Sequence, residues 1–170
     1  MDHEPSPKLS DPKGLLLGYL AYYRRAVLRK LEGLSEADLN RAVLPSGWTP
    51  LQLLNHLIHM ERRWLHWGFA GNQVPDPWAD HLEGDARAER WVLPEGATLA
   101  TLSARLKEIG RLTEDLTADA GLLDRGRLGG RWDDDPPPLS WILLHVLQEY
   151  ARHAGHLDVV RELIDGSVGE

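Results

Sequence analysis

Residues 140–166 read SWILLHVLQEYARHAGHLDVVRELIDG and give the clearest indication of the fold. Its apolar residues recur at intervals of three and four, which is the period of an α-helix with one apolar face. We expect this helix to run from Trp141 to about Leu163, with Ser140 as its N-cap, and to stop at Asp165 and Gly166. Helices with such faces pack against one another around a shared core.

Three further segments have the same helical period. They are residues 14 to about 33, residues 50 to about 70, and a segment that begins near Thr98. Thr49 followed by Pro50 is a helix start, because proline at the first helical position needs no hydrogen-bond acceptor. A short capped turn is expected at Ser35. Four amphipathic helices without a strand pattern predict an all-α four-helix bundle.

One domain accounts for the whole chain of 170 residues. We expect a flexible N-terminal arm over residues 1–13, the bundle over 14–166 and a tail over 167–170. Two long loops interrupt the bundle. Residues 71–96 are rich in Gly, Pro, Asp and Trp and predict a crossover or a lid. Residues 121–138 end in three Asp and three Pro, which predict a solvated acidic turn rather than a metal site.

Composition excludes several classes of function. There are 19 Lys and Arg against 26 Asp and Glu, a net charge of −7, and this balance disfavours nucleic acid as a partner. Because the chain contains no Cys, it has no disulfide, thiolate metal site or cysteine nucleophile. No apolar run approaches the about 20 residues that span a bilayer, and the N-terminus has no signal-peptide pattern. We therefore expect a cytoplasmic protein without a membrane partner.

The polar residues of 140–166 fall on one narrow strip. At roughly 100° per residue, His145, His153 and His156 all lie within about 40° of Glu149. Ile142 and Val160 lie on the same strip, so we expect it to face the bundle interior. Burying a carboxylate with imidazoles is costly unless the charge is compensated, and a divalent metal would do so. The alternative is a surface ion pair between Glu149 and His153.

The segment LQLLNHLIHMERRW, residues 51–64, supplies another ligand. His56 lies on its inward apolar stripe, whereas His59 and Arg63 lie at the edge of that stripe. We predict that His56, Glu149 and His153 bind one metal, although a lone His on an apolar face is also typical of a core residue. Two imidazoles and a carboxylate with an open position suit catalytic zinc. Ferrous iron or nickel would also accept this ligand set.

The remaining His and Trp residues, together with Arg63, are expected around the metal site, on the surface or in the core. We expect His59, Arg63, His145 and His156 to surround the metal or line its pocket. His3 and His81 are expected to be solvated, and His66 to lie on a helix surface. The Trp residues predict core and bundle-end packing, and three of them could instead line the mouth of a pocket: Trp67, Trp78 and Trp91.

The stretches GWTPLQLLNHLIHMERRW, residues 47–64, and HVLQEYARHAGHLDVVRELIDG, residues 145–166, resemble the DinB-like superfamily of four-helix bundles, in the branch called domain of unknown function 664. Many members bind a divalent metal with three histidines. Here Glu149 replaces one of them, which is similar to the N-terminal domain of the mycothiol-dependent maleylpyruvate isomerases. In that branch a His, a Glu and a His bind zinc, at the positions of His56, Glu149 and His153.

The resemblance implies an S-transferase that uses mycothiol or bacillithiol, whose thiolate a metal would hold for attack on a small electrophile. Isomerase activity is not expected, because a further domain contributes to the isomerase site and this chain ends soon after residue 163. The alternatives are metal-assisted hydrolysis by a bound hydroxide, a binding module of the stress response without turnover, and a metal-free structural role. The resemblance also allows a homodimer formed through the bundle faces.

Overall fold

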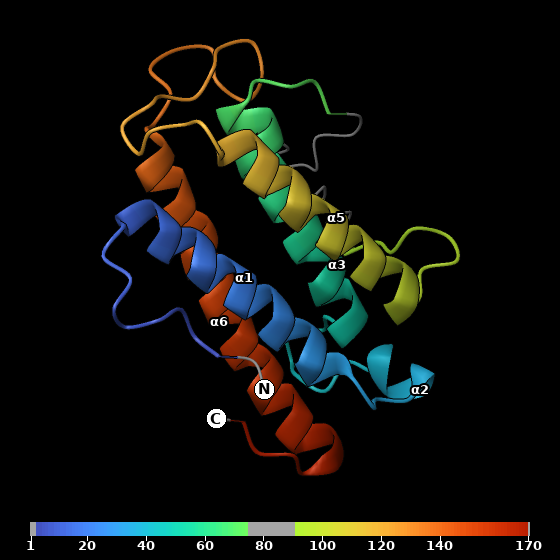
Figure 1. The fold of residues 1–170 in the computed structure, drawn as a ribbon. Coiled ribbons are helices and arrows are strands. Elements are labelled where there is room, and N and C mark those ends of the chain that lie inside the picture. Colours follow the sequence, from blue (N-terminus) through green and yellow to red (C-terminus); the bar gives the residue numbers. More distant parts are fainter. Residues whose placement is uncertain (1–2, 75–90, 170) are drawn as a thin grey trace.

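The computed structural model describes residues 3–74 and 91–169. Its main helices are α1 (Pro12–Leu31), α3 (Pro50–Glu61), α5 (Leu99–Thr117) and α6 (Leu139–Asp165), with a short α2 (Glu36–Leu39) between the first two (Figure 1). α3 continues directly into a π-helix, η1 (Arg62–Phe69). No strand forms in the described residues, where Arg125 and Pro138, and Leu128 and Trp132, make isolated bridges. The predicted all-α bundle is confirmed.

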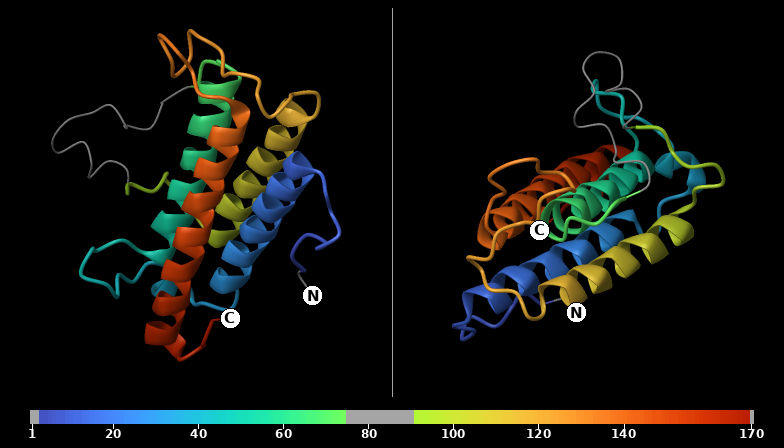
Figure 2. Two further views of the ribbon diagram at one scale, coloured as in Figure 1. Left: turned by 90° about the vertical axis from the view of Figure 1, so that its left-hand side faces the viewer. Right: turned by 90° about the horizontal axis from the view of Figure 1, so that it is seen from above.

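The four long helices are arranged so that each contacts two others. α1 packs on α6 and α5, and α3 packs on α5 and α6 (Figure 2). α3 and α5 run in the same direction (Figure 1). Most of residues 71–96, which the sequence predicted to form a crossover or a lid, lies outside the described residues. Trp78 and His81 lie outside the described residues, and no helix within the described part is long and apolar enough to cross a membrane.

Local sequence sets most helix starts. Thr49 and Gln52 form a reciprocal capping box at α3, and Thr98 and Thr101 form another at α5. Asp11 caps α1, which begins at Pro12 and therefore includes the last two residues of the predicted arm. The described part of the remaining arm, residues 3–11, lies beside α1, where Pro5 is against Gly18.

Ser140 does not cap α6, contrary to the prediction. The helix begins at Leu139, and Pro138 occupies the N-cap position without a side-chain hydrogen bond. The loop supplies the missing acceptors, because the Leu139 N–H donates to the Asp124 carbonyl at 2.8 Å and the Ser140 N–H donates to the Leu122 carbonyl at 2.9 Å. These carbonyls of the preceding loop accept hydrogen bonds from the first N–H groups of α6. In the other long helices an N-cap side chain has this role.

The π-helical segment η1 is the other departure from the predicted helix over residues 50–70. A π-helix has hydrogen bonds between residues five positions apart. At the end of η1 the Ala70 N–H donates such a bond to the Leu65 carbonyl, at 2.9 Å. The wider turn alters which side chains after Glu61 face the bundle. Within this segment His66 is half-buried, whereas the sequence predicted an ordinary surface position.

Candidate metal site

His56, Glu149 and His153 come together between α3 and α6. Glu149 Oε2 lies 3.9 Å from His56 Nε2 and 3.4 Å from His153 Nε2. One ligand atom from each of the three residues lies within 4.8 Å of the others. Donors bound to one tetrahedral zinc at about 2.0–2.2 Å would lie roughly 3.4 Å apart. The three side chains fit such an ion after a small closure of the group.

The site lies at the edge of the buried face of α6, on the strip that was predicted to face the bundle interior. Ile142 and Val160 on the strip are buried as expected. The side chains of Glu149 and His56 remain 16% exposed and that of His153 12% exposed. A position at the edge lowers the desolvation cost of the charged groups and leaves one side open to a small molecule.

The electrostatics of the site favour the protonation states in which Glu149 and His56 can bind a metal. The nearby imidazole of His153, and then that of His56, lowers the pKa of the Glu149 carboxyl well below its ordinary range. Burial lowers the pKa of His56, although Glu149 acts in the opposite direction. Glu149 is therefore ionised and His56 neutral at pH 7, and these are the protonation states in which both groups bind metals.

Further rings hold the two imidazoles in place. Trp91 stacks on His56, with ring centroids 5.3 Å apart and planes inclined by 24°. His156 lies on the far side of His153, with their Nδ1 atoms 3.2 Å apart, and Trp48 lies near His156. Since the Nε2 atom of His153 faces Glu149, the contact with His156 fixes which nitrogen of His153 points to the site. Trp91, which the sequence named as a residue that could line a pocket mouth, therefore lies against one of the candidate ligands.

The other three residues that were predicted to surround the metal or line its pocket are His59, Arg63 and His145, and each has its own set of neighbours. His59 is buried, and its Nδ1 atom accepts a hydrogen bond from Arg62 at 3.0 Å. Arg63 is also buried, and its charge acts on His56. His145 belongs to an aromatic cluster, with ring centroids 4.2 Å from Trp64 and 5.3 Å from Trp141.

Trp67 belongs to a second aromatic group. The Arg131 guanidinium lies over the rings of Trp64, Trp67 and Trp132, at 4.2, 5.8 and 5.2 Å from their centroids. Arg131 and Trp132 come from the loop over residues 121–138, so these cation–π contacts attach that loop to η1. Trp67 therefore packs at the end of the bundle, as most of the Trp residues were predicted to do.

The family model for mycothiol-S-transferases matches residues 15–166 of this chain. The chain belongs to the mycothiol S-transferase family. This match covers α3, α5, α6 and all but the first three residues of α1, and it includes all three residues of the candidate site, so the DinB-like assignment is confirmed. A search of curated proteins finds no match to the chain.

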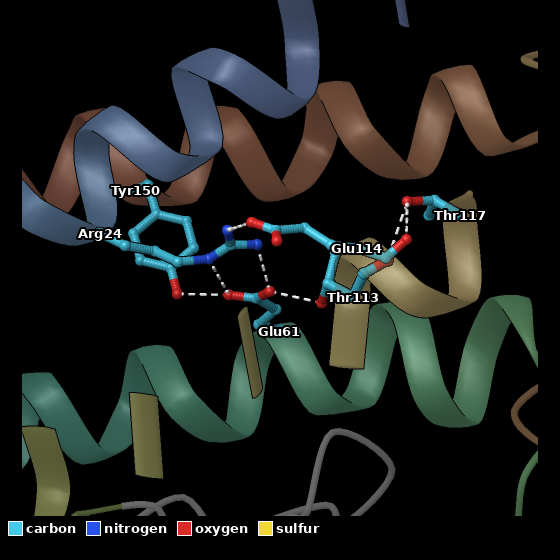
Figure 3. A network of polar contacts seen from close by, with 6 residues as sticks. All are labelled: Arg24, Glu61, Thr113, Glu114, Thr117 and Tyr150. Carbon is cyan, nitrogen blue, oxygen red and sulfur yellow. Dashed lines mark hydrogen bonds and ion pairs between the residues drawn. The ribbon is translucent and has the colours of Figure 1, made fainter. Parts of the chain in front are cut away.

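A second polar cluster of this family member was missed by the sequence analysis. Glu61 is completely buried, and its carboxylate accepts from Arg24, Thr113 and Tyr150 (Figure 3). Arg24 is a charged residue on the apolar stripe of α1, and Glu61 has the same kind of position on α3. Two opposite charges at core positions were the signal that could have predicted the pair.

Proposed function

We propose that this chain is a divalent-metal-dependent S-transferase that joins a low-molecular-weight thiol to a small electrophile. The observation that carries the proposal is the meeting of His56, Glu149 and His153 in a chain of the mycothiol S-transferase family. These three residues would hold the ion. Zinc is the metal that we expect, with nickel or iron as alternatives, because two imidazoles and a carboxylate suit each of them.

A divalent ion bound there would lower the pKa of a thiol and keep it as the nucleophilic thiolate. The protein's own residues prepare the site. Glu149 supplies a negative charge that is already ionised, and Trp91 restricts the ring of His56. His156 orients His153 through the contact between their Nδ1 atoms. Ligands held in this way lose little freedom when they bind an ion.

The sulfur of the reaction must come from a co-substrate, because the chain has no Cys. The sulfur of mycothiol or bacillithiol would attack an electrophilic carbon and form the C–S bond. The leaving group would depart with the bonding electron pair, and the thiol proton would pass to solvent. The side chains of His153 and Glu149 keep 12% and 16% of their surface exposed, and we expect both molecules to approach the ion from this exposed side.

The first experiment measures metal content in protein purified without an affinity metal. The wild type is compared with Glu149→Gln and with Glu162→Gln, a matched control that makes the same change at an exposed position of α6. We expect about one ion per chain in the wild type and in Glu162→Gln, and none in Glu149→Gln. A wild type that neither holds nor takes up Zn²⁺, Ni²⁺ or Fe²⁺ would refute the metal site.

The second experiment measures turnover of the metal-loaded protein with a thiol and an activated electrophile. We expect product only when mycothiol or bacillithiol is present, and none from Glu149→Gln. Turnover without any thiol would instead support metal-assisted hydrolysis. Metal binding with no turnover for any pair would support a binding module.

Three expectations about the surroundings of the protein stay predictions. They are a cytoplasmic location, the absence of a nucleic-acid partner, and a homodimer. For the last, α6 exposes 48% of Trp141, 56% of Leu144 and 49% of Val159. Light scattering of the wild type and of Leu144→Glu tests whether this face joins two copies.

A further inference from the structure

Among the described residues, polar contacts join α3 to α6 at two places that matter for the candidate site. One is between His56 and Glu149 in the candidate metal site, at 3.9 Å. The other is the hydrogen bond that the Tyr150 hydroxyl donates to Glu61 Oε2, at 2.6 Å. Glu149 and Tyr150 are adjacent on α6. Their partners on α3, His56 and Glu61, are separated by about 7.5 Å along the helix axis at roughly 1.5 Å per residue. Two such contacts together restrict both sliding and rotation of one helix against the other.

We propose that Tyr150 and Glu61 are positioning residues that hold α6 in the register where Glu149 and His153 meet His56. This inference rests on the metal site proposed above. Neither residue touches the three ligands in the contacts described for the site. Their effect passes through the backbone of α6, because any shift of Tyr150 also moves Glu149, its neighbour in sequence.

The Glu61 carboxylate is suited to this role because both oxygens are fully engaged. Oε1 accepts from Arg24 Nη2 at 2.5 Å and from Thr113 Oγ1 at 2.5 Å. Oε2 accepts from Arg24 Nε at 3.0 Å and from Tyr150 at 2.6 Å. The donors come from α1, α5 and α6, so Glu61 on α3 is tied to the other three long helices at one level (Figure 3). A carboxylate held from three sides cannot rotate to follow a displaced partner.

The surroundings of the network preserve this geometry. Glu61 and Tyr150 are 0% exposed, so water cannot replace the hydrogen bond between them. On α5, Gly110 leaves room for Arg24, since an added Cβ would lie 3.1 Å from Arg24 Cδ. Burial, followed by the Glu61 carboxylate, raises the pKa of Tyr150 far above 10, so the phenol keeps the proton that it donates.

A comparison of two conservative variants separates positioning from simple stabilisation. Tyr150→Phe removes the donor on α6, the helix that carries Glu149 and His153. Thr113→Val removes a donor to the same carboxylate from α5, which carries none of the three ligands. Both substitutions keep the shape of a buried side chain and delete one hydrogen bond to one charged acceptor, so their costs in stability should be similar.

The readouts are the affinity for Zn²⁺, from competition with a chromophoric chelator, and the visible spectrum of the Co²⁺ form, which reports ligand geometry. We expect Tyr150→Phe to bind Zn²⁺ about tenfold more weakly and to alter the Co²⁺ spectrum, whereas Thr113→Val stays within about twofold of the wild type. Circular dichroism verifies that both variants fold.

Equal affinities for Zn²⁺ in Tyr150→Phe and the wild type would overturn the inference and leave the metal site intact. The same would follow if Tyr150→Phe and Thr113→Val weakened binding by one common factor, because loss of stability alone would then explain the effect. A wild type without any metal affinity would remove the proposed function and this inference together.

Discussion

His59 makes the stability of this protein sensitive to acid. Its side chain is 8% exposed and accepts a hydrogen bond from Arg62 at 3.0 Å. Burial, and then the positive charges of Arg62 and Arg105, lower the pKa of His59 to about 3 from its ordinary 6.5. The folded protein therefore keeps this imidazole neutral at pH values where the unfolded chain protonates it.

The sign of the effect follows from proton uptake. Below pH 6.5 the unfolded chain binds a proton at His59 that the folded chain excludes until about pH 3, so the free energy of unfolding falls as the pH falls through this interval. Above pH 6.5 the penalty is absent. Integrated from pH 7 to pH 5, this single group removes about 2 kcal/mol of stability.

The variant His59→Asn tests this reasoning, because the Asn carbonyl can still accept from Arg62 but does not titrate. Urea unfolding is measured for both proteins at pH 7 and pH 5, with EDTA present so that metal binding does not contribute. We expect the loss of stability between the two pH values to be about 2 kcal/mol smaller in the variant. The same loss in both proteins would refute this prediction, because it would show that the folded state protonates His59 near its ordinary pKa.

Three further predictions concern glycines and the metal. Gly155→Ala should raise the free energy of unfolding by about 1 kcal/mol, because an added Cβ meets nothing within 4 Å; chemical denaturation measures this. Gly110→Ala should lower it by roughly 1–3 kcal/mol, since the Cβ would press on Arg24; a gain would contradict the tight packing. With free Zn²⁺ at 100 times its Kd, the melting temperature should rise by about 5–11 °C, and this rise should vanish in Glu149→Gln.

Sequence periodicity predicted the helices because their starts are local. Thr49 and Thr98 satisfy N–H groups only three residues away, and a short window of sequence contains both partners. The start of α6 could not be predicted in this way, because the acceptors for Leu139 and Ser140 are carbonyls of the preceding loop. The π-helical turn after Glu61 likewise has no local signal.

The candidate site was predictable for a related reason. Glu149 and His153 are four residues apart on one helix, so their proximity follows from helix geometry alone. His56 required the further assumption that its stripe faces α6, and the structure supports it with a 3.9 Å approach to Glu149. The Glu61 network joins four helices, and its partners depend on how those helices are rotated. Periodicity gives each helix a buried face but does not say which polar residues on those faces meet.

The two carboxylates between α3 and α6 differ in how their charge is balanced. Glu61 has a buried guanidinium, Arg24, at 2.5 Å, and its oxygens are fully used by donors. Glu149 lies between imidazoles, and the pKa of one of them, His56, is lowered by burial, so that ring adds no positive charge at pH 7. The nearest guanidinium to Glu149 in the described contacts belongs to Arg152, at 3.7 Å, and its side chain is 52% exposed. Glu61 therefore has no capacity left for an ion, whereas Glu149 keeps a negative charge that a divalent cation would balance.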